Sequence, residues 1–122
     1  MVMARKLFAA LFIAASLTPS NALAGREDPT WNPPPEFDYP FPGKMEVRYL
    51  PQHLVVKECH RIGPRLRHLF DLRGCSRPVS KSYCLVIVSS ETYKRATPSA
   101  ILRHERGHCN GWRHPVSERP IR

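Results

Sequence analysis

The chain has 122 residues, with 19 Lys and Arg against 10 Asp and Glu and a formal net charge of +9. This length accommodates one domain, because two halves of it would each be too short to build a core. Thirteen Pro, four Cys and six Gly exclude collagen-like and Gly/Ser-linker chains. A hydrophobic fraction of 42% excludes a wholly disordered chain. The positive charge raises the question of nucleic-acid binding.

Residues 1–24 have the layout of a secretory signal peptide. Arg5 and Lys6 precede an apolar run over residues 7–17, and Ala22-Leu23-Ala24 supplies a cleavage site. The run is shorter than the roughly 20 residues that span a bilayer. We therefore expect an exported, periplasmic or extracellular protein with no membrane span after cleavage. The mature chain would keep 98 residues and a net charge of +7.

Residues 25–44 form a proline-rich N-terminal arm. Six prolines alternate here with Trp31 and three other aromatic residues. Proline supports neither a helix interior nor a central strand, so the segment is expected to be extended and partly ordered. Its aromatic side chains would either pack over the domain or contact a partner.

The domain itself is predicted over residues 45–122, beginning with strands. Residues 45–50 alternate apolar and polar side chains, and residues 54–59 are also strand-like, with a turn at residues 51–53 between them. Tyr83–Ser89 is a continuous β-branched run, which favours a central strand.

Two helices are predicted, one on each side of the Tyr83–Ser89 strand in the chain. Residues 66–72 favour a short helix that ends near Gly74. Pro98–Cys109 is predicted as a helix of about three turns, since Thr97 is a good N-cap and Pro suits the first helical position. Asn110-Gly111 then provides a strong stop signal.

All four cysteines (Cys59, Cys75, Cys84 and Cys109) lie in the mature part of the chain. An even number of cysteines in a small exported domain indicates two disulfides. No CxxC pair occurs, which argues against a cysteine-type zinc finger. Three connectivities are open. The shortest separation favours Cys75–Cys84, which would leave Cys59 for Cys109.

Residues 104–114 carry the pattern HExxHxxGxxH. His104 and His108 lie four apart, so on a helix both imidazoles project from one face and can bind one Zn²⁺. Glu105 flanks them at about 100° around the axis, where a general base belongs. Gly111 lets the chain turn back, so that His114 can supply a third ligand. Three protein ligands leave a fourth position open, as in catalytic zinc sites.

Chance gives this full pattern in a chain of this composition on the order of once in twenty thousand. Two alternatives remain open for the ligands. Cys109 is either a zinc thiolate or, more in keeping with an exported chain, half of a disulfide. His68 is a substitute third ligand if His114 fails. Carboxylates that orient the imidazoles are sought by type alone among Asp71, Glu91 and Glu118.

The run from His104 to His114 resembles the metzincin signature of zinc-dependent metallopeptidases, within the wider zincin group. The variant HERGHCNGW, residues 104–112, also resembles a group of short exported bacterial proteins of largely unassigned function. This resemblance implies zinc ligation by His104, His108 and His114, with Glu105 as the base.

The same resemblance implies an α+β fold: a small zincin-like core with a short antiparallel or mixed sheet packed on a C-terminal active-site helix, stapled by disulfides. It implies hydrolysis of a peptide or protein substrate through a zinc-bound water. In zincins a strand near the helix pairs with extended substrate, a role open to Tyr83–Ser89 or a neighbouring strand. Donors to a developing oxyanion are sought by type among Tyr83, Tyr93, Arg103 and Arg113.

Two other function classes compete with the peptidase. One is a non-catalytic binding module stapled by zinc, and the other is a basic protein that binds anionic envelope components or nucleic acid in transfer. The basic residues cluster in the middle of the chain, but without the interleaved aromatics of RNA- and DNA-binding motifs, which argues against nucleic acid. The cluster comprises Arg61, Arg65, Arg67, Arg73, Arg77 and Lys81.

Overall fold

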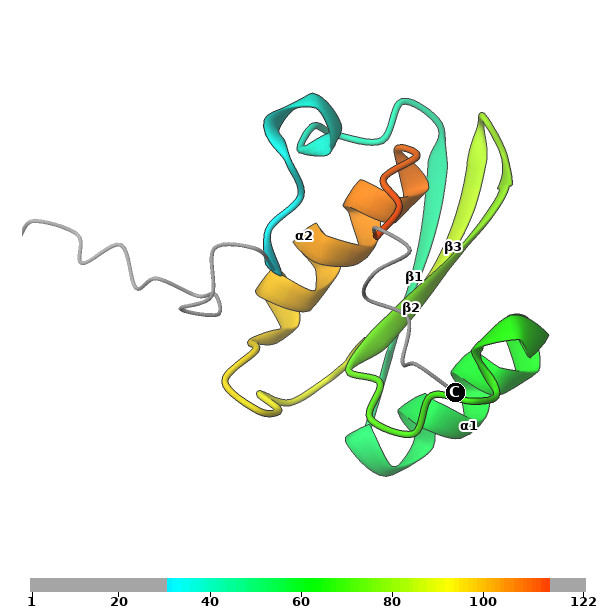
Figure 1. Cartoon of the computed structure of the whole chain (residues 1–122), viewed down its shortest axis with the longest axis vertical. Coiled ribbons are helices and arrows are strands. Elements are labelled where there is room, and N and C mark those ends of the chain that lie inside the picture. The colour runs from blue at the N-terminus through cyan, green and yellow to red at the C-terminus, as the bar shows by residue number, and fades with distance from the viewer. Residues whose placement is uncertain (1–30, 115–122) are drawn as a thin grey trace, which may run out of the picture.

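A computed structural model describes residues 31–114 (Figure 1). The predicted signal peptide, the first part of the proline-rich arm and Glu118 lie outside the described residues. The elements in chain order are β1 (Lys44–Leu50), α1 (Gln52–Ile62), β2 (Gly74–Ser80), β3 (Tyr83–Ser89) and α2 (Pro98–Cys109), with 3-10 turns at Pro35–Phe37 and Pro64–Leu66. The predicted α+β class is confirmed: two helices pack on a three-stranded mixed sheet.

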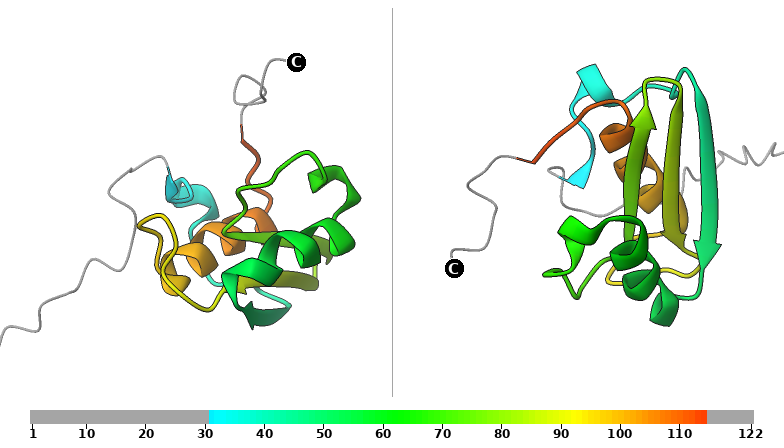
Figure 2. Two further views of the ribbon diagram at one scale, coloured as in Figure 1. Left: turned by 90° about the horizontal axis from the view of Figure 1, so that it is seen from below. Right: turned by 90° about the vertical axis from the view of Figure 1, so that its right-hand side faces the viewer.

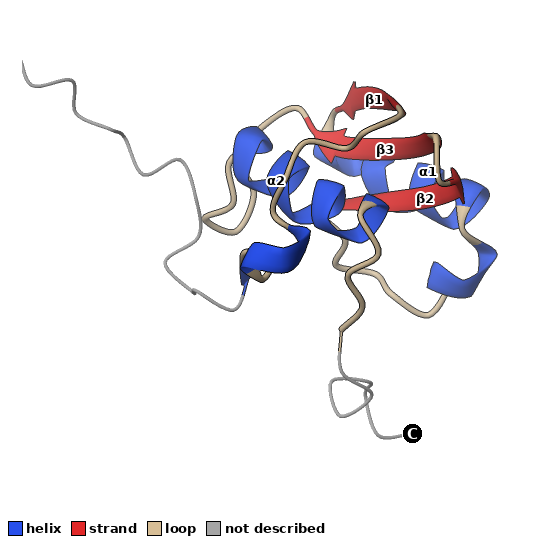
Figure 3. Ribbon diagram, turned by 90° about the horizontal axis from the view of Figure 1, so that it is seen from above, coloured by secondary structure: helices blue, strands red, loops and turns tan. Residues whose placement is uncertain are grey.

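The strands are ordered β1-β3-β2 (Figure 3). β3 is the central strand, as its apolar sequence predicts. It pairs in parallel with β1, with Val47 opposite Val86, and antiparallel with β2, with Ser76 opposite Val86. β1 and β2 are therefore the two edges of the sheet.

The two helices cover opposite faces of this sheet (Figure 2). Successive side chains of a strand point to opposite faces. On β3, Cys84, Val86 and Val88 belong to the buried cluster that includes Ile101 of α2. Ile87 belongs to a second cluster with Val55 of α1. The small domain thus has two cores, one on each side of the sheet.

Two of the local predictions are wrong, and both fall between β1 and β3. Residues 54–59 lie in α1, because Val55, Cys59 and Ile62 recur at helical spacing and are buried on one face. This packing overrides the strand propensity of the two valines. Residues 66–72 form a 3-10 turn and an irregular loop instead of a helix.

The strand β2 was not predicted, because Gly74 and Pro78 are both unfavourable in strands. The structure explains why each of these two residues is tolerated in β2. A Cβ on Gly74 would lie 2.6 Å from the Ile87 carbonyl oxygen and 2.7 Å from Cγ2 of Ile101, so only glycine lets α2 approach here. Pro78 is tolerated because β2 is an edge strand.

Both disulfides predicted from the cysteine count form, but the favoured pairing is wrong. The bridges are Cys59–Cys75 and Cys84–Cys109. The register places Cys75 opposite Ile87, so Cys84 lies three positions further along and on the other face of the sheet. Each bridge therefore joins one helix to the strand beneath it. Disulfides of this kind are typical of oxidising compartments.

The described part of the arm, residues 31–43, packs along α2. Asp38 forms ion pairs with Arg103 and Arg106. The Asn110 side chain donates hydrogen bonds to the backbone carbonyls of Phe37 and Tyr39, at 2.9 and 2.7 Å. Of the two possibilities for this arm, packing over the domain is the one that is seen. None of the helices within residues 31–114 is long and apolar enough to cross a membrane.

Candidate metal centre

Helix α2 begins and ends as its sequence predicts. The Thr97 hydroxyl accepts a hydrogen bond from the Ala100 N–H at 3.2 Å, and Pro98 follows as the first helical residue. At the other end Gly111 has a φ of 105°, and the Trp112 N–H donates to the Gly107 carbonyl at 3.0 Å. This is a Schellman motif, which reverses the chain directly after the helix. The residues that follow are thereby returned to the helix face that carries His104 and His108.

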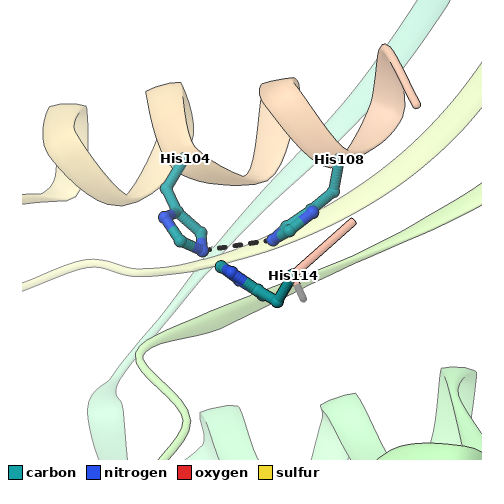
Figure 4. Close-up of side chains that lie close together, drawn as sticks. All are labelled: His104, His108 and His114. Atoms are coloured by element: carbon teal, nitrogen blue, oxygen red, sulfur yellow. Dashed lines mark hydrogen bonds between the residues drawn. The ribbon is translucent and has the colours of Figure 1, made fainter. Parts of the chain in front are cut away.

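The structure brings the three predicted ligands together (Figure 4). His104 and His108 project from adjacent turns of α2, and His114 comes back beneath them. One ring nitrogen of each histidine lies within 4.8 Å of the other two, so the group could hold a metal ion. His104 is 5% exposed, whereas His114 lies at the surface. The site is thus buried on its helical side and open at its third ligand.

Two backbone carbonyls fix the tautomers of the helical histidines. His104 Nδ1 lies 2.6 Å from the Trp31 carbonyl oxygen, and His108 Nδ1 lies 2.8 Å from the Trp112 carbonyl oxygen. A carbonyl oxygen only accepts, so both Nδ1 atoms carry the proton. Each Nε2 atom is then left with a lone pair.

These two Nε2 atoms are 3.2 Å apart and face each other. Two lone pairs repel at this distance unless a cation lies between them. Burial lowers the pKa of His108, and this effect outweighs the hydrogen bond to the Trp112 carbonyl, which raises it, so a proton shared between the two Nε2 atoms is disfavoured. A tetrahedral zinc with Zn–N bonds of about 2.0–2.1 Å separates its ligand nitrogens by about 3.3 Å. The two helical nitrogens therefore have the spacing of neighbouring ligands on such a cation, and His114 lies close enough to complete a three-histidine metal site.

Both tryptophans of the chain pack against this cluster. The Trp31 ring stacks on His104 with ring centroids 3.8 Å apart, and the Trp112 ring stacks on His108 at 4.7 Å. The apolar rings shield the ligands from water and hold their ring planes. The tryptophan fluorescence of the protein therefore arises entirely beside the candidate metal site.

Glu105 lies beside the histidines and is only 6% exposed. Its side chain packs over Gly74 of β2, and a hydrogen bond with Ser76 favours its ionised form. Burial outweighs that hydrogen bond and raises the pKa of Glu105 to about 8. A carboxyl group with this pKa exchanges a proton near neutral pH, as a general base or acid must.

Glu105 and the three histidines open into one cavity of about 500 Å³. Helix α2 and residues 112–114 form one side of the cavity, and β2 lies along it. The loop between α1 and β2 also lines the cavity, through Leu66, Leu69 and Leu72. A site with ligands, a titratable carboxyl group and an adjoining cavity has the composition expected of an active site.

The other residues considered from the sequence are more scattered. Asp71 and Arg113 line the cavity. Asp71 accepts from Tyr93 at 3.2 Å and pairs with Lys94 at 2.5 Å. Glu91 instead accepts from the Gln52 N–H at the start of α1. Tyr83 donates to Glu46 and Arg103 to Asp38, so both are engaged elsewhere.

Both alternative ligands are disfavoured by the structure. Cys109 forms a disulfide with Cys84, so it offers no thiolate. His68 is exposed and does not belong to the histidine group found within the described residues. The set His104, His108 and His114 is the one that the fold assembles.

Sequence reasoning missed the groups that orient the ligands. Carboxylates are the residue type expected to orient the imidazoles, whereas the structure uses the Trp31 and Trp112 backbone carbonyls. Every residue has a carbonyl, so no side-chain pattern reports which one is used. Only the Gly111 stop signal pointed towards it, since the helix ending places the Trp112 carbonyl near His108.

Comparisons with known protein families, with curated proteins and with solved structures find no match for this chain.

Proposed function

We propose that the protein is an exported zinc-dependent metallopeptidase with a minimal zincin-like core. His104, His108 and His114 would hold the zinc, and Glu105 would act as the base. The observation that carries this proposal is the pair of Nε2 atoms, 3.2 Å apart, whose lone pairs face each other beside a buried carboxyl group.

Zinc in such a site lowers the pKa of a water ligand towards neutrality and polarises a carbonyl group. The chain's own residues supply the rest. The Trp31 and Trp112 carbonyls hold the two imidazoles in the ligand tautomer. Glu105 would take a proton from the attacking water and pass it to the leaving amine.

The sheet offers one edge for an extended peptide near this site. Tyr83–Ser89 is not that edge, because β3 is paired on both sides. The neighbouring strand β2 is an edge, and Gly74, Ser76 and Pro78 of this strand line the cavity. A peptide that added to β2 would pass beside the histidines.

Zinc content and peptide cleavage, measured together, test this proposal. The chain is expressed from its full sequence into an oxidising compartment, and cleavage of a peptide library is assayed with Glu105→Gln. We expect one zinc per chain and a loss of kcat/KM of about 100-fold or more in this variant, with its zinc retained. Glu36→Gln, at an exposed glutamate, is the matched control and should be silent. Zinc binding without Glu105-dependent cleavage would contradict the enzyme.

That last result would favour the second candidate, a non-catalytic binding module whose fold is stabilised by zinc. The Schellman turn supports it as well, because a metal at His114 would tie the segment after α2 back to the helix. Failure of the wild type to take up zinc would exclude both the peptidase and the zinc-stabilised binding module. The basic anion-binding protein is less well supported, since within the basic cluster Arg61 pairs with Glu58 and Arg77 donates to the Ile62 carbonyl.

A further inference from the structure

Three leucines of the loop between α1 and β2 line the cavity, beside Asp71 and Arg73 of the same loop. We call Leu66, Leu69 and Leu72 the leucine wall. The two tryptophan rings line the cavity from the side of the histidines. A substrate side chain that entered here from the metal site would contact leucine side chains and tryptophan rings.

The backbone holds the middle of the leucine wall in place. The Leu69 N–H donates to the Leu66 carbonyl at 2.9 Å, and the Leu69 carbonyl accepts from His60 Nε2 at 2.7 Å. The Cys59–Cys75 bridge closes the loop that carries the wall and anchors it to β2. The wall is therefore a preorganised surface, which lowers the cost of ordering a ligand against it.

Leu69 differs from the other two leucines of the wall. Leu66 and Leu72 also pack against the core on the α1 face, whereas Leu69 lies outside that cluster. Burial in a core explains Leu66 and Leu72 without a ligand, but it does not explain Leu69. The next residue, Phe70, is 78% exposed, packs edge-on against His60 and does not line the cavity.

Charge around the cavity disfavours a cationic side chain. Arg73 and Arg113 both line it, and Arg73 lies over the Trp31 ring at 5.2 Å. The carboxylate of Asp71 also lines the cavity, but Lys94 is paired with it. A lysine or arginine of a substrate would therefore meet like charge and an apolar wall.

On this basis we propose that the cavity is the specificity pocket of the enzyme. It accepts one large aliphatic or aromatic side chain next to the scissile bond, and Leu69 determines this preference. This inference rests on the proposed function for the position of the scissile bond, but the pocket can be tested separately.

Hydroxamates, which chelate zinc, serve as probes on the zinc-loaded full chain. The dissociation constants of acetohydroxamate, 4-methylpentanoyl hydroxamate and 6-aminohexanoyl hydroxamate are measured by tryptophan fluorescence. We expect the branched apolar probe to bind about tenfold or more tightly than acetohydroxamate, because it buries additional methyl and methylene groups. The cationic probe should bind no more tightly than acetohydroxamate.

Leu69→Asp should remove the gain of the apolar probe, and Phe70→Asp, the matched control, should keep it. Equal binding of the apolar probe and acetohydroxamate to the wild type, or a gain that survives Leu69→Asp, would overturn the pocket. Chelator-treated protein is titrated in parallel with isopentanol and isopentylamine, using NMR of the leucine methyl groups. We expect shifts at Leu69 with the alcohol only, and absence of these shifts would also overturn the pocket.

These outcomes separate the two proposals. If the protein prefers the apolar probe but cleaves no peptide, the specificity pocket is supported and the peptidase function is contradicted. If cleavage depends on Glu105 but its side-chain preference is unchanged in Leu69→Asp, the peptidase function is supported and the specificity pocket is contradicted.

Discussion

The two faces of the sheet are built from different chemistry. The α2 face buries His104 and Glu105 together with its apolar residues, and it carries the candidate metal site. The buried residues of the α1 face are Val55, Ile62, Ile87 and the Cys59–Cys75 bridge. Buried polar groups cost stability unless they are partnered, whereas apolar burial contributes it. The α1 face is therefore built from apolar residues and a disulfide, whereas the α2 face carries the candidate metal site.

Each face also has its own disulfide, and removing the two bridges separately tests this division most strongly. Loops of this length make each bridge worth about 3 kcal/mol of unfolding free energy. We expect Cys84→Ser with Cys109→Ser, and Cys59→Ser with Cys75→Ser, to show similar losses in urea denaturation.

Their functional effects should differ. Cys109 adjoins His108, so loss of its bridge should weaken zinc binding about tenfold or more. Loss of Cys59–Cys75 should leave zinc affinity intact and abolish the preference for the apolar hydroxamate. Equal effects of the two double variants on zinc affinity would contradict the division of labour between the faces.

Two glycines give a finer comparison. In Gly74→Ala the new Cβ meets backbone and a buried isoleucine at less than 3 Å, so α2 must move off the sheet. We expect a loss of about 2 kcal/mol in unfolding free energy and weaker zinc binding. Gly63→Ala at the end of α1 is the control, because its Cβ meets the flexible end of Leu66 at 3.0 Å. A larger loss at Gly63 than at Gly74 in urea denaturation would refute this explanation.

The smallest effect concerns the arm that packs on α2. A hydrogen bond from Arg103 holds the pKa of Asp38 below its usual value of 3.8. The ionised carboxylate therefore stabilises the folded protein above about pH 4, and this contribution is lost as the pH falls through the lowered pKa. We expect Asp38→Asn to cost about 1 kcal/mol at neutral pH and progressively less in acid.

Urea denaturation of both proteins at neutral and acidic pH measures this difference. Asp71→Asn removes a more exposed ion pair and serves as the control, with a smaller expected effect. A deficit of Asp38→Asn that stays constant down to the most acidic pH would show that charge is not its cause.

The sequence allowed better predictions on one face of the sheet than on the other. The α2 helix, its cap, its glycine stop and the convergence of the histidines follow from local signals that tertiary contacts reinforce. The segment from α1 to β2 was mispredicted, because burial against β3 overrides strand propensity at Val55 and permits Gly74 in a strand. The disulfide pairing depends on the register between β2 and β3, so it could not be predicted from the sequence.

The zinc content of the purified protein tests the three-histidine site most directly. After incubation with zinc and dialysis, we expect one zinc per chain in the wild type and in His53→Ala, whose histidine is exposed on α1. His104→Ala and His108→Ala should lose it, and only the zinc-binding proteins should show a zinc-dependent change in tryptophan fluorescence. A wild type that retains no zinc, or a His104→Ala variant that retains it fully, would contradict the site.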